Sequence, residues 1–295
     1  MPYIWLGIGL LAGATKGFCG KKTSGQISGW QDAMLVNILR MVICVVIGLV
    51  TVLAGGQVRA LAASPRALAI YALSGITTSV FVVTWMIAVR SSAYVLISVF
   101  TMLGTIVPML LGRFCYGEVI AWNQWVGFGL LMLATWILYS HSSKIKTKLS
   151  LKDLVVLLIC GVANGLSGFS QKMFQNDVTG SSVSVFNLYT YLISGVCLLA
   201  VYLCVHSHQA EKAGKLPKIV VFYMPVMAVC LFLNSYAFTM AAGSIPASVL
   251  YPLTQGAGLV LSGLMSVLFF KEKLSAKAII GLSIAFVGLM VTKFL

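Results

Sequence analysis

Two positively charged side chains lie inside apolar blocks of the sequence, and they are the first candidates for binding chemistry. Lys16 falls near the end of the first apolar block, and Arg40 falls within the second. A charge inside a membrane costs about 2.5–3.5 kcal/mol on insertion scales, and it usually faces a cavity. Both groups donate hydrogen bonds, and the planar fork of Arg40 suits the paired oxygens of a carboxylate or phosphate. The structural alternative is that Lys16 reaches the membrane interface and Arg40 bonds helix carbonyls.

Polar amides and aromatic rings within the apolar blocks form a second group of candidates. An amide without a partner is costly in an apolar span, so it bonds either a neighbouring helix or a ligand. Asn37 and Asn187 occupy corresponding positions of the repeat described below, which favours a helix-to-helix role for them. Tyr251 stands before Pro252, which frees a backbone carbonyl and lets this span bend toward a substrate.

The acidic residues are as informative as the basic ones, because all six fall in predicted loops or at span ends. Coupling to protons through a mid-span carboxylate is therefore not expected, and neither is a cation held by direct charge pairing. The acidic residues are Asp32, Glu118, Asp153, Asp177, Glu211 and Glu272.

Motifs of catalysis and cofactor binding are missing from the sequence. There is no H-E-x-x-H, no Walker-type phosphate loop and no Ser/His/Asp arrangement. The seven cysteines have no framework spacing, and the three histidines fall at loop ends without acidic partners. We therefore expect no enzyme activity, no cofactor and no metal site.

The composition predicts an all-α integral membrane protein. Hydrophobic residues make up 60% of the chain, charged residues only 9%, and the mean hydropathy is +1.00. The net charge of +14 is an orientation signal in membrane loops and does not indicate nucleic-acid binding.

Lys and Arg favour the loops after odd-numbered spans, which places those loops in the cytoplasm and both termini outside. The ten predicted spans are roughly 3–20, 33–54, 68–89, 93–112, 121–139, 153–173, 183–205, 219–241, 246–270 and 277–294, each about the length that crosses a bilayer.

Two parts of the sequence echo each other and predict an internal repeat. Aligning Glu118 with Glu272 places 93–96 on 247–250, and 17–21 matches 168–172 at a slightly smaller offset. We expect two five-helix halves, 1–140 and 153–295, joined by the basic linker 141–152. Because five is odd, the second half enters the membrane inverted relative to the first, as in many secondary transporters.

These features resemble a known family. The apolar block, Gly-Glu or Lys-Glu turn and Gly-containing apolar block at 117–129 and 269–288 are similar to the end of an EamA-type repeat in the drug/metabolite transporter superfamily. The resemblance implies ten helices as two inverted repeats, with a central cavity lined by spans 6, 8 and 9. The intramembrane glutamate of the small multidrug exporters in that superfamily has no counterpart here. The candidate substrate-binding residues are Lys16, Arg40, Trp85, Asn164, Asn234, Tyr236, Tyr251 and Gln255.

The sequence thus predicts a secondary transporter of a small organic metabolite that is neutral, zwitterionic or anionic. An exporter of lipophilic or quaternary cations, held by aromatic faces, is the alternative within transport. An intramembrane enzyme or a lipid scramblase is the alternative from another class. The expected partners are a small-molecule substrate and the lipid bilayer, with no nucleic acid, and the expected form is a monomer or weak homodimer in a bacterial cytoplasmic membrane.

Overall fold

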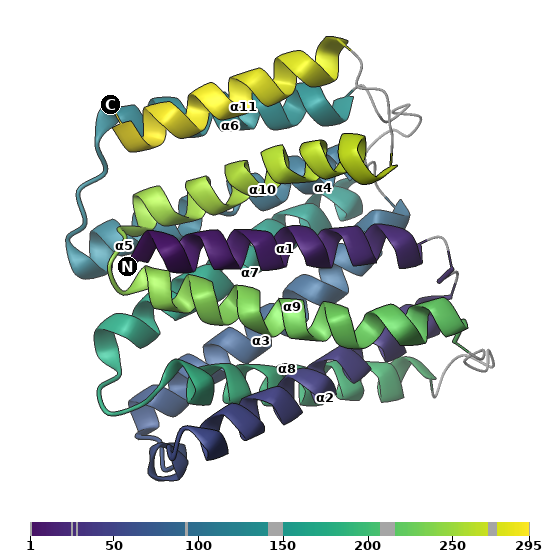
Figure 1. Cartoon of the computed structure of the whole chain (residues 1–295), viewed down its shortest axis with the longest axis vertical. Coiled ribbons are helices and arrows are strands. Elements are labelled where there is room, and N and C mark those ends of the chain that lie inside the picture. Colours follow the sequence, from purple (N-terminus) through teal and green to yellow (C-terminus); the bar gives the residue numbers. More distant parts are fainter. Residues whose placement is uncertain are drawn as a thin grey trace. The chain divides into compact units, whose positions relative to one another are not determined.

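The computed structural model describes residues 2–24, 26–27, 29–91, 94–140, 150–206, 216–270 and 276–294. All regular structure in this part of the chain is helical (Figure 1). A short 3-10 turn lies at Val58–Leu61. The α-helices are α1 (Pro2–Ser24), α2 (Trp30–Ala54), α3 (Pro65–Ser91), α4 (Tyr94–Leu103), α5 (Ile106–Tyr116), α6 (Trp122–Ser140), α7 (Leu151–Asp177), α8 (Val183–His206), α9 (Lys218–Ala242), α10 (Ala247–Phe270) and α11 (Ala276–Phe294).

Each predicted span corresponds to helical structure, and six stretches are long and apolar enough to cross a membrane on length and composition alone. The chain is therefore a multi-pass integral membrane protein of the all-α class. The linker 141–149 and Glu272 lie outside the described residues.

The fourth predicted span, 93–112, differs from the expectation because it consists of two helices, α4 and α5. Pro108 has no N–H for the carbonyl of Gly104, and its ring disfavours a regular turn there. The hydrogen bonds shift to the shorter spacing: Thr105 N–H donates to Met102 O at 3.0 Å, and Val107 N–H donates to Gly104 O at 3.1 Å. This break releases backbone carbonyls that a regular helix would occupy.

The helices form two compact units. Unit 1 comprises residues 1–79 and 173–243, and unit 2 comprises residues 80–172 and 244–295. Each unit draws helices from both halves of the sequence, so the repeat 1–140 and 153–295 describes the sequence and stays a prediction.

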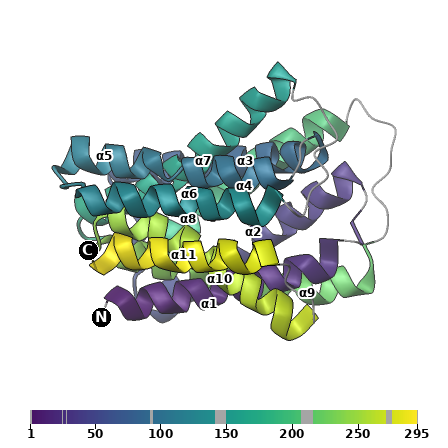
Figure 2. The ribbon, with the colours of Figure 1, turned by 90° about the horizontal axis from the view of Figure 1, so that it is seen from above.

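In unit 1, α1 packs along α9 and α2 packs along α8 (Figures 1 and 2). Met41 lies against Gly195, and Gly48 lies against Leu188, so α2 and α8 run antiparallel. A cluster of buried apolar residues that includes Tyr71, Phe174 and Phe186 forms the core at one end of this unit.

In unit 2, α6 and α11 form the most extensive helix pair (Figures 1 and 2). Asn123 Nδ2 donates to Val291 O at 3.2 Å, and Gly288 lies against Leu131, so this pair is also antiparallel. The α4–α5 break packs against α7, where Gly104 faces Gly161 and Gly165 so closely that a Cβ at any of them would meet a backbone carbonyl. The absence of side chains is what permits this backbone contact.

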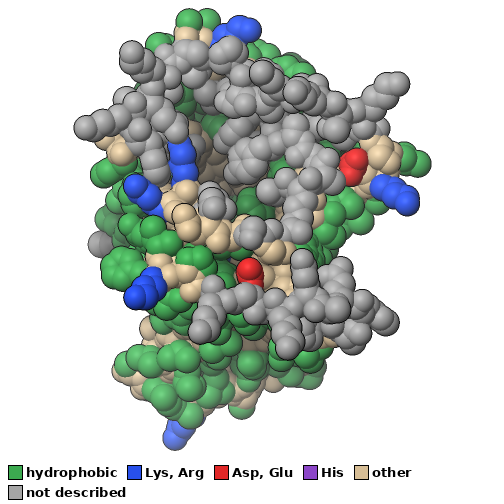
Figure 3. Space-filling view, turned by 90° about the vertical axis from the view of Figure 1, so that its right-hand side faces the viewer, with side chains coloured by type: hydrophobic (Ala, Val, Ile, Leu, Met, Phe, Trp, Pro, Cys, Tyr) green, Lys and Arg blue, Asp and Glu red, His purple; other side chains and the backbone are tan. Residues whose placement is uncertain are grey.

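The outer surface of the described helices is largely apolar. Large hydrophobic side chains are exposed along α2, α7, α8 and α11, and Figure 3 shows hydrophobic groups over most of the described part of one face. In water such continuous apolar area would be unfavourable, but in a bilayer it contacts lipid chains.

Candidate functional site

The two intramembrane cations lie together in unit 1, around the middle of α9. Lys16 on α1 and Arg40 on α2 are close enough to interact electrostatically, and the neutral thiol of Cys44 lies near both. Cys44 Sγ donates to Ala228 O at 3.3 Å, and Tyr191 Oη on α8 donates to Leu231 O at 3.2 Å. Four helices, α1, α2, α8 and α9, thus contribute to one polar cluster inside an apolar unit.

Arg40 is held in place by Asn37, one turn earlier on α2. Asn37 Nδ2 donates to Ala33 O at 2.8 Å, which turns Oδ1 toward the guanidinium, and Arg40 Nη1 donates to that oxygen at 3.1 Å. Arg40 Nε is buried and has no hydrogen-bond partner. Nη1 of the guanidinium is therefore engaged by Asn37, whereas Nε has no hydrogen-bond partner.

Within the described ranges, no carboxylate pairs with Lys16 or Arg40. The ion pairs that the structure records join Arg66 to Asp177 at 3.2 Å and Lys172 to Glu118 at 2.7 Å. Two unneutralised cations, on helices that both pack against α9, create a positive region in a low-dielectric setting. Such a region is chemically suited to an anionic group or to a strong oxygen acceptor.

The other two unit 1 candidates make structural contacts. Asn234 Nδ2 donates to Gly9 O at 2.7 Å and so joins α9 to α1, as the helix-bonding alternative predicts. Tyr236 packs its ring against Trp5, with centroids 5.7 Å apart, and against Phe232. Both candidates therefore hold neighbouring elements of the unit 1 scaffold together.

Three candidates in unit 2 lie on α7 and α10. Asn164 Nδ2 on α7 donates to Thr101 O at 3.3 Å, in the last turn of α4 before the α4–α5 break. Tyr251 is buried and donates its hydroxyl to Gly168 O, one turn beyond Asn164 on α7. Gln255 follows one turn later on α10 and is partly buried.

Trp85 is the remaining candidate. It lies on α3 and is 37% exposed. The sequence candidates thus divide between the units: Lys16, Arg40, Asn234 and Tyr236 belong to unit 1, and Trp85, Asn164, Tyr251 and Gln255 belong to unit 2. Their predicted convergence on one cavity stays a prediction.

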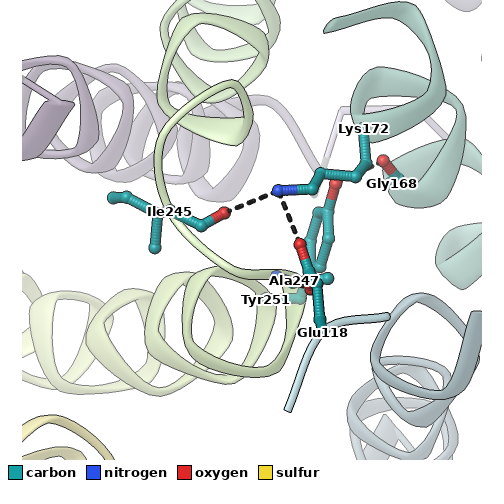
Figure 4. Close-up of polar contacts among 6 residues, drawn as sticks. All are labelled: Glu118, Gly168, Lys172, Ile245, Ala247 and Tyr251. Atoms are coloured by element: carbon teal, nitrogen blue, oxygen red, sulfur yellow. Dashed lines mark hydrogen bonds and ion pairs between the residues drawn. The ribbon is translucent and has the colours of Figure 1, made fainter. Parts of the chain in front are cut away.

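A second polar cluster in unit 2 surrounds the start of α10 (Figure 4). Glu118 follows the left-handed Gly117 that ends α5, and its carboxylate accepts from Ala247 N–H at 2.7 Å. Lys172 Nζ on α7 pairs with the other carboxylate oxygen at 2.7 Å and donates to Ile245 O at 3.2 Å. These bonds tie α5, α7 and the first turn of α10 together.

From the sequence, Glu118 was a landmark of the repeat and one of the acidic residues outside the spans, Lys172 was only part of the repeated segment 168–172, and Asn37 was predicted to join helices. The position of Lys172 inside the apolar block of α7 was a usable signal, because an intramembrane charge needs a partner. The three-residue spacing of Asn37 and Arg40 was another, since it places both on one helix face.

Comparisons with known proteins identify the family of this chain. The model of the EamA-like transporter family matches residues 146–294, and the chain belongs to this family. The predicted membership in the drug/metabolite transporter superfamily is thereby confirmed. A solved structure described only as "Crystal structure of protein" is similar with a TM-score of 0.80 at 14% identity, covering 99% of this chain and 96% of that one. No curated protein matches the sequence.

Proposed function

We propose that this protein is a secondary transporter of a small organic metabolite with an anionic or strongly oxygen-accepting group. The observation that carries the proposal is that Lys16 and Arg40 lie on two helices packed against α9 in unit 1, and neither forms an ion pair with a carboxylate among the described residues. A substrate that brings its own negative charge supplies the missing partner and gains charge-assisted hydrogen bonds. We place this transporter in the cytoplasmic membrane of a bacterium.

The proposed mechanism is alternating access between two inverted five-helix halves. The packing of α2 on α8 and of α6 on α11 supports it, because each pair joins helices at equivalent positions of the predicted repeat. Both pairs are antiparallel, as inversion requires. Repeat-equivalent helices that pack on each other lie where a pseudo-two-fold axis would pass.

The decisive experiment is flux into proteoliposomes, after a ligand panel has been screened by thermal shift. A ligand that binds only the folded state raises its stability, so the screen selects candidate substrates by their binding alone. We expect stabilisation by anionic or zwitterionic metabolites and saturable flux of the same compounds. Stabilisation by quaternary cations alone would favour the aromatic exporter, and a ligand that is consumed without net movement would indicate an enzyme.

A further inference from the structure

The guanidinium of Arg40 presents its two edges very differently. Nη1 is engaged with Asn37 Oδ1, whose orientation is set by the bond from Asn37 Nδ2 to Ala33 O. Nε is buried without a partner, and Nε and Nη2 together form the side edge of the guanidinium. A buried donor without an acceptor is uncommon in native structures and indicates that an acceptor is supplied at some stage.

The described neighbours of Arg40 give its Nε no acceptor. Cys44 donates its hydrogen to Ala228 O, and Tyr191 donates its hydrogen to Leu231 O. Lys16 adds a second positive charge close by. Around Arg40 the described residues therefore contribute donors that already have acceptors and a second positive charge, and none of them supplies an acceptor to Nε.

We infer that Asn37 is a positioning residue that holds Arg40 so that its Nε–Nη2 edge binds two oxygens of one substrate oxyanion. A carboxylate and a phosphate share this chemistry, because each offers two oxygens at the spacing of two parallel N–H donors. This inference rests on the proposed function and narrows its substrate class to carriers of such a group. Asn37 acts through Arg40 and does not itself contact the substrate.

Side-chain NMR of the full chain, labelled with ¹⁵N at arginine Nε and held in nanodiscs, tests the inference directly. The sequence has five arginines, Arg40, Arg59, Arg66, Arg90 and Arg113, and the signal lost in Arg40→Lys identifies Arg40. The probes are acetate and inorganic phosphate, with chloride and acetamide as controls at matched ionic strength. We expect acetate, phosphate or both to move the Arg40 Nε–H signal saturably, and the anion that does so defines the group.

Variants of Asn37 test the positioning role. Asn37→Leu removes the acceptor of Nη1, and Asn37→Asp keeps an acceptor but adds a charge that competes with the anion. Each substitution should lower the affinity for the anion that moves the Arg40 signal by about tenfold, which is the effect of losing roughly one charge-assisted hydrogen bond. Gln175→Leu is the matched control, since Gln175 Nε2 makes a comparable amide bond to Thr239 O within unit 1. It should leave the Arg40 response unchanged.

The outcomes separate this inference from the proposed function. The inference is overturned if neither acetate nor phosphate moves the Arg40 signal. It is also overturned if Asn37→Leu and Asn37→Asp bind the anion with wild-type affinity. Either result counts even if proteoliposomes transport substrate. If an anion binds at Arg40 but no stabilising ligand is transported, the inference about Arg40 and Asn37 is supported and the proposed transport function is refuted.

Discussion

The ion pair of Glu118 and Lys172 gives an asymmetric prediction, because its two partners have different second contacts. Glu118→Gln keeps an oxygen for Ala247 N–H but leaves the Lys172 ammonium beside the positive end of the α10 dipole. Lys172→Met leaves the Glu118 carboxylate at that same helix N-terminus, where a negative charge is favourable. The glutamate substitution should therefore be the more damaging one.

The magnitudes follow from burial. The side chains of Lys172 and Glu118 are 7% and 12% exposed, so solvent screens the pair weakly. Removing one partner of a buried pair costs about 3–5 kcal/mol, and Glu118→Gln should lie near 3 kcal/mol because Lys172 keeps Ile245 O. Lys172→Met should cost about 1–2 kcal/mol, because the helix N-terminus offsets part of the loss. The double variant should recover to about 1 kcal/mol, since replacing both charges leaves none buried.

Unfolding in mixed micelles, followed by circular dichroism, measures this cycle. Asp177→Asn is the control, because its partner Arg66 is 71% exposed and such a pair contributes only about 0–1 kcal/mol. If Glu118→Gln and Lys172→Met lower the free energy of unfolding equally, the role of the α10 N-terminus is refuted. A double variant as unstable as the sum of both would refute the coupling.

Three further outcomes are expected. Arg40→Ala should weaken substrate binding by about 2 kcal/mol or more with partial rescue by Arg40→Lys, whereas unchanged affinity in a folded variant would return Arg40 to a structural role. Gly104→Ala should lower the thermal unfolding temperature sharply because its Cβ meets a carbonyl of α7, and Gly129→Ala, where a Cβ meets no atom, should not. Substrate exchange should persist when the proton gradient is collapsed, because no carboxylate was predicted within a span; strict proton dependence, lost on neutralising one acidic residue, would contradict this.

The helical framework was predictable because each apolar block is about as long as the hydrocarbon is thick, and Gly, Ser and Pro mark the turns. The α4–α5 break was not predicted, since composition alone shows a continuous apolar block across Gly104. Pro108 was the local signal, but the contact of the break with α7, where Asn164 Nδ2 donates to Thr101 O, involves residues far away in the sequence.

The candidate site was predictable only in part. Lys16 and Arg40 stand out in sequence because charge inside a span is rare, and the structure brings them together. The partners of Asn234 and Glu118 lie far away along the chain, so no local pattern could reveal that one joins α1 and the other caps α10. Whether a polar side chain bonds the scaffold or awaits a ligand is decided by such distant neighbours.

Unit 1 combines helices from the beginning and the later part of the chain, so its packing partners are synthesised at different times. α1 ends at Ser24, but its packing partner α9 begins only at Lys218. At about 5–20 residues per second, a ribosome needs roughly 10–40 s to make the intervening chain. During that interval α1 and α2 wait in the bilayer with a packing face uncovered, and Lys16 and Arg40 lack their neighbours on α9. A chain whose synthesis stops before Lys218 therefore has two charged side chains in its membrane helices without the α9 that covers them in the complete unit.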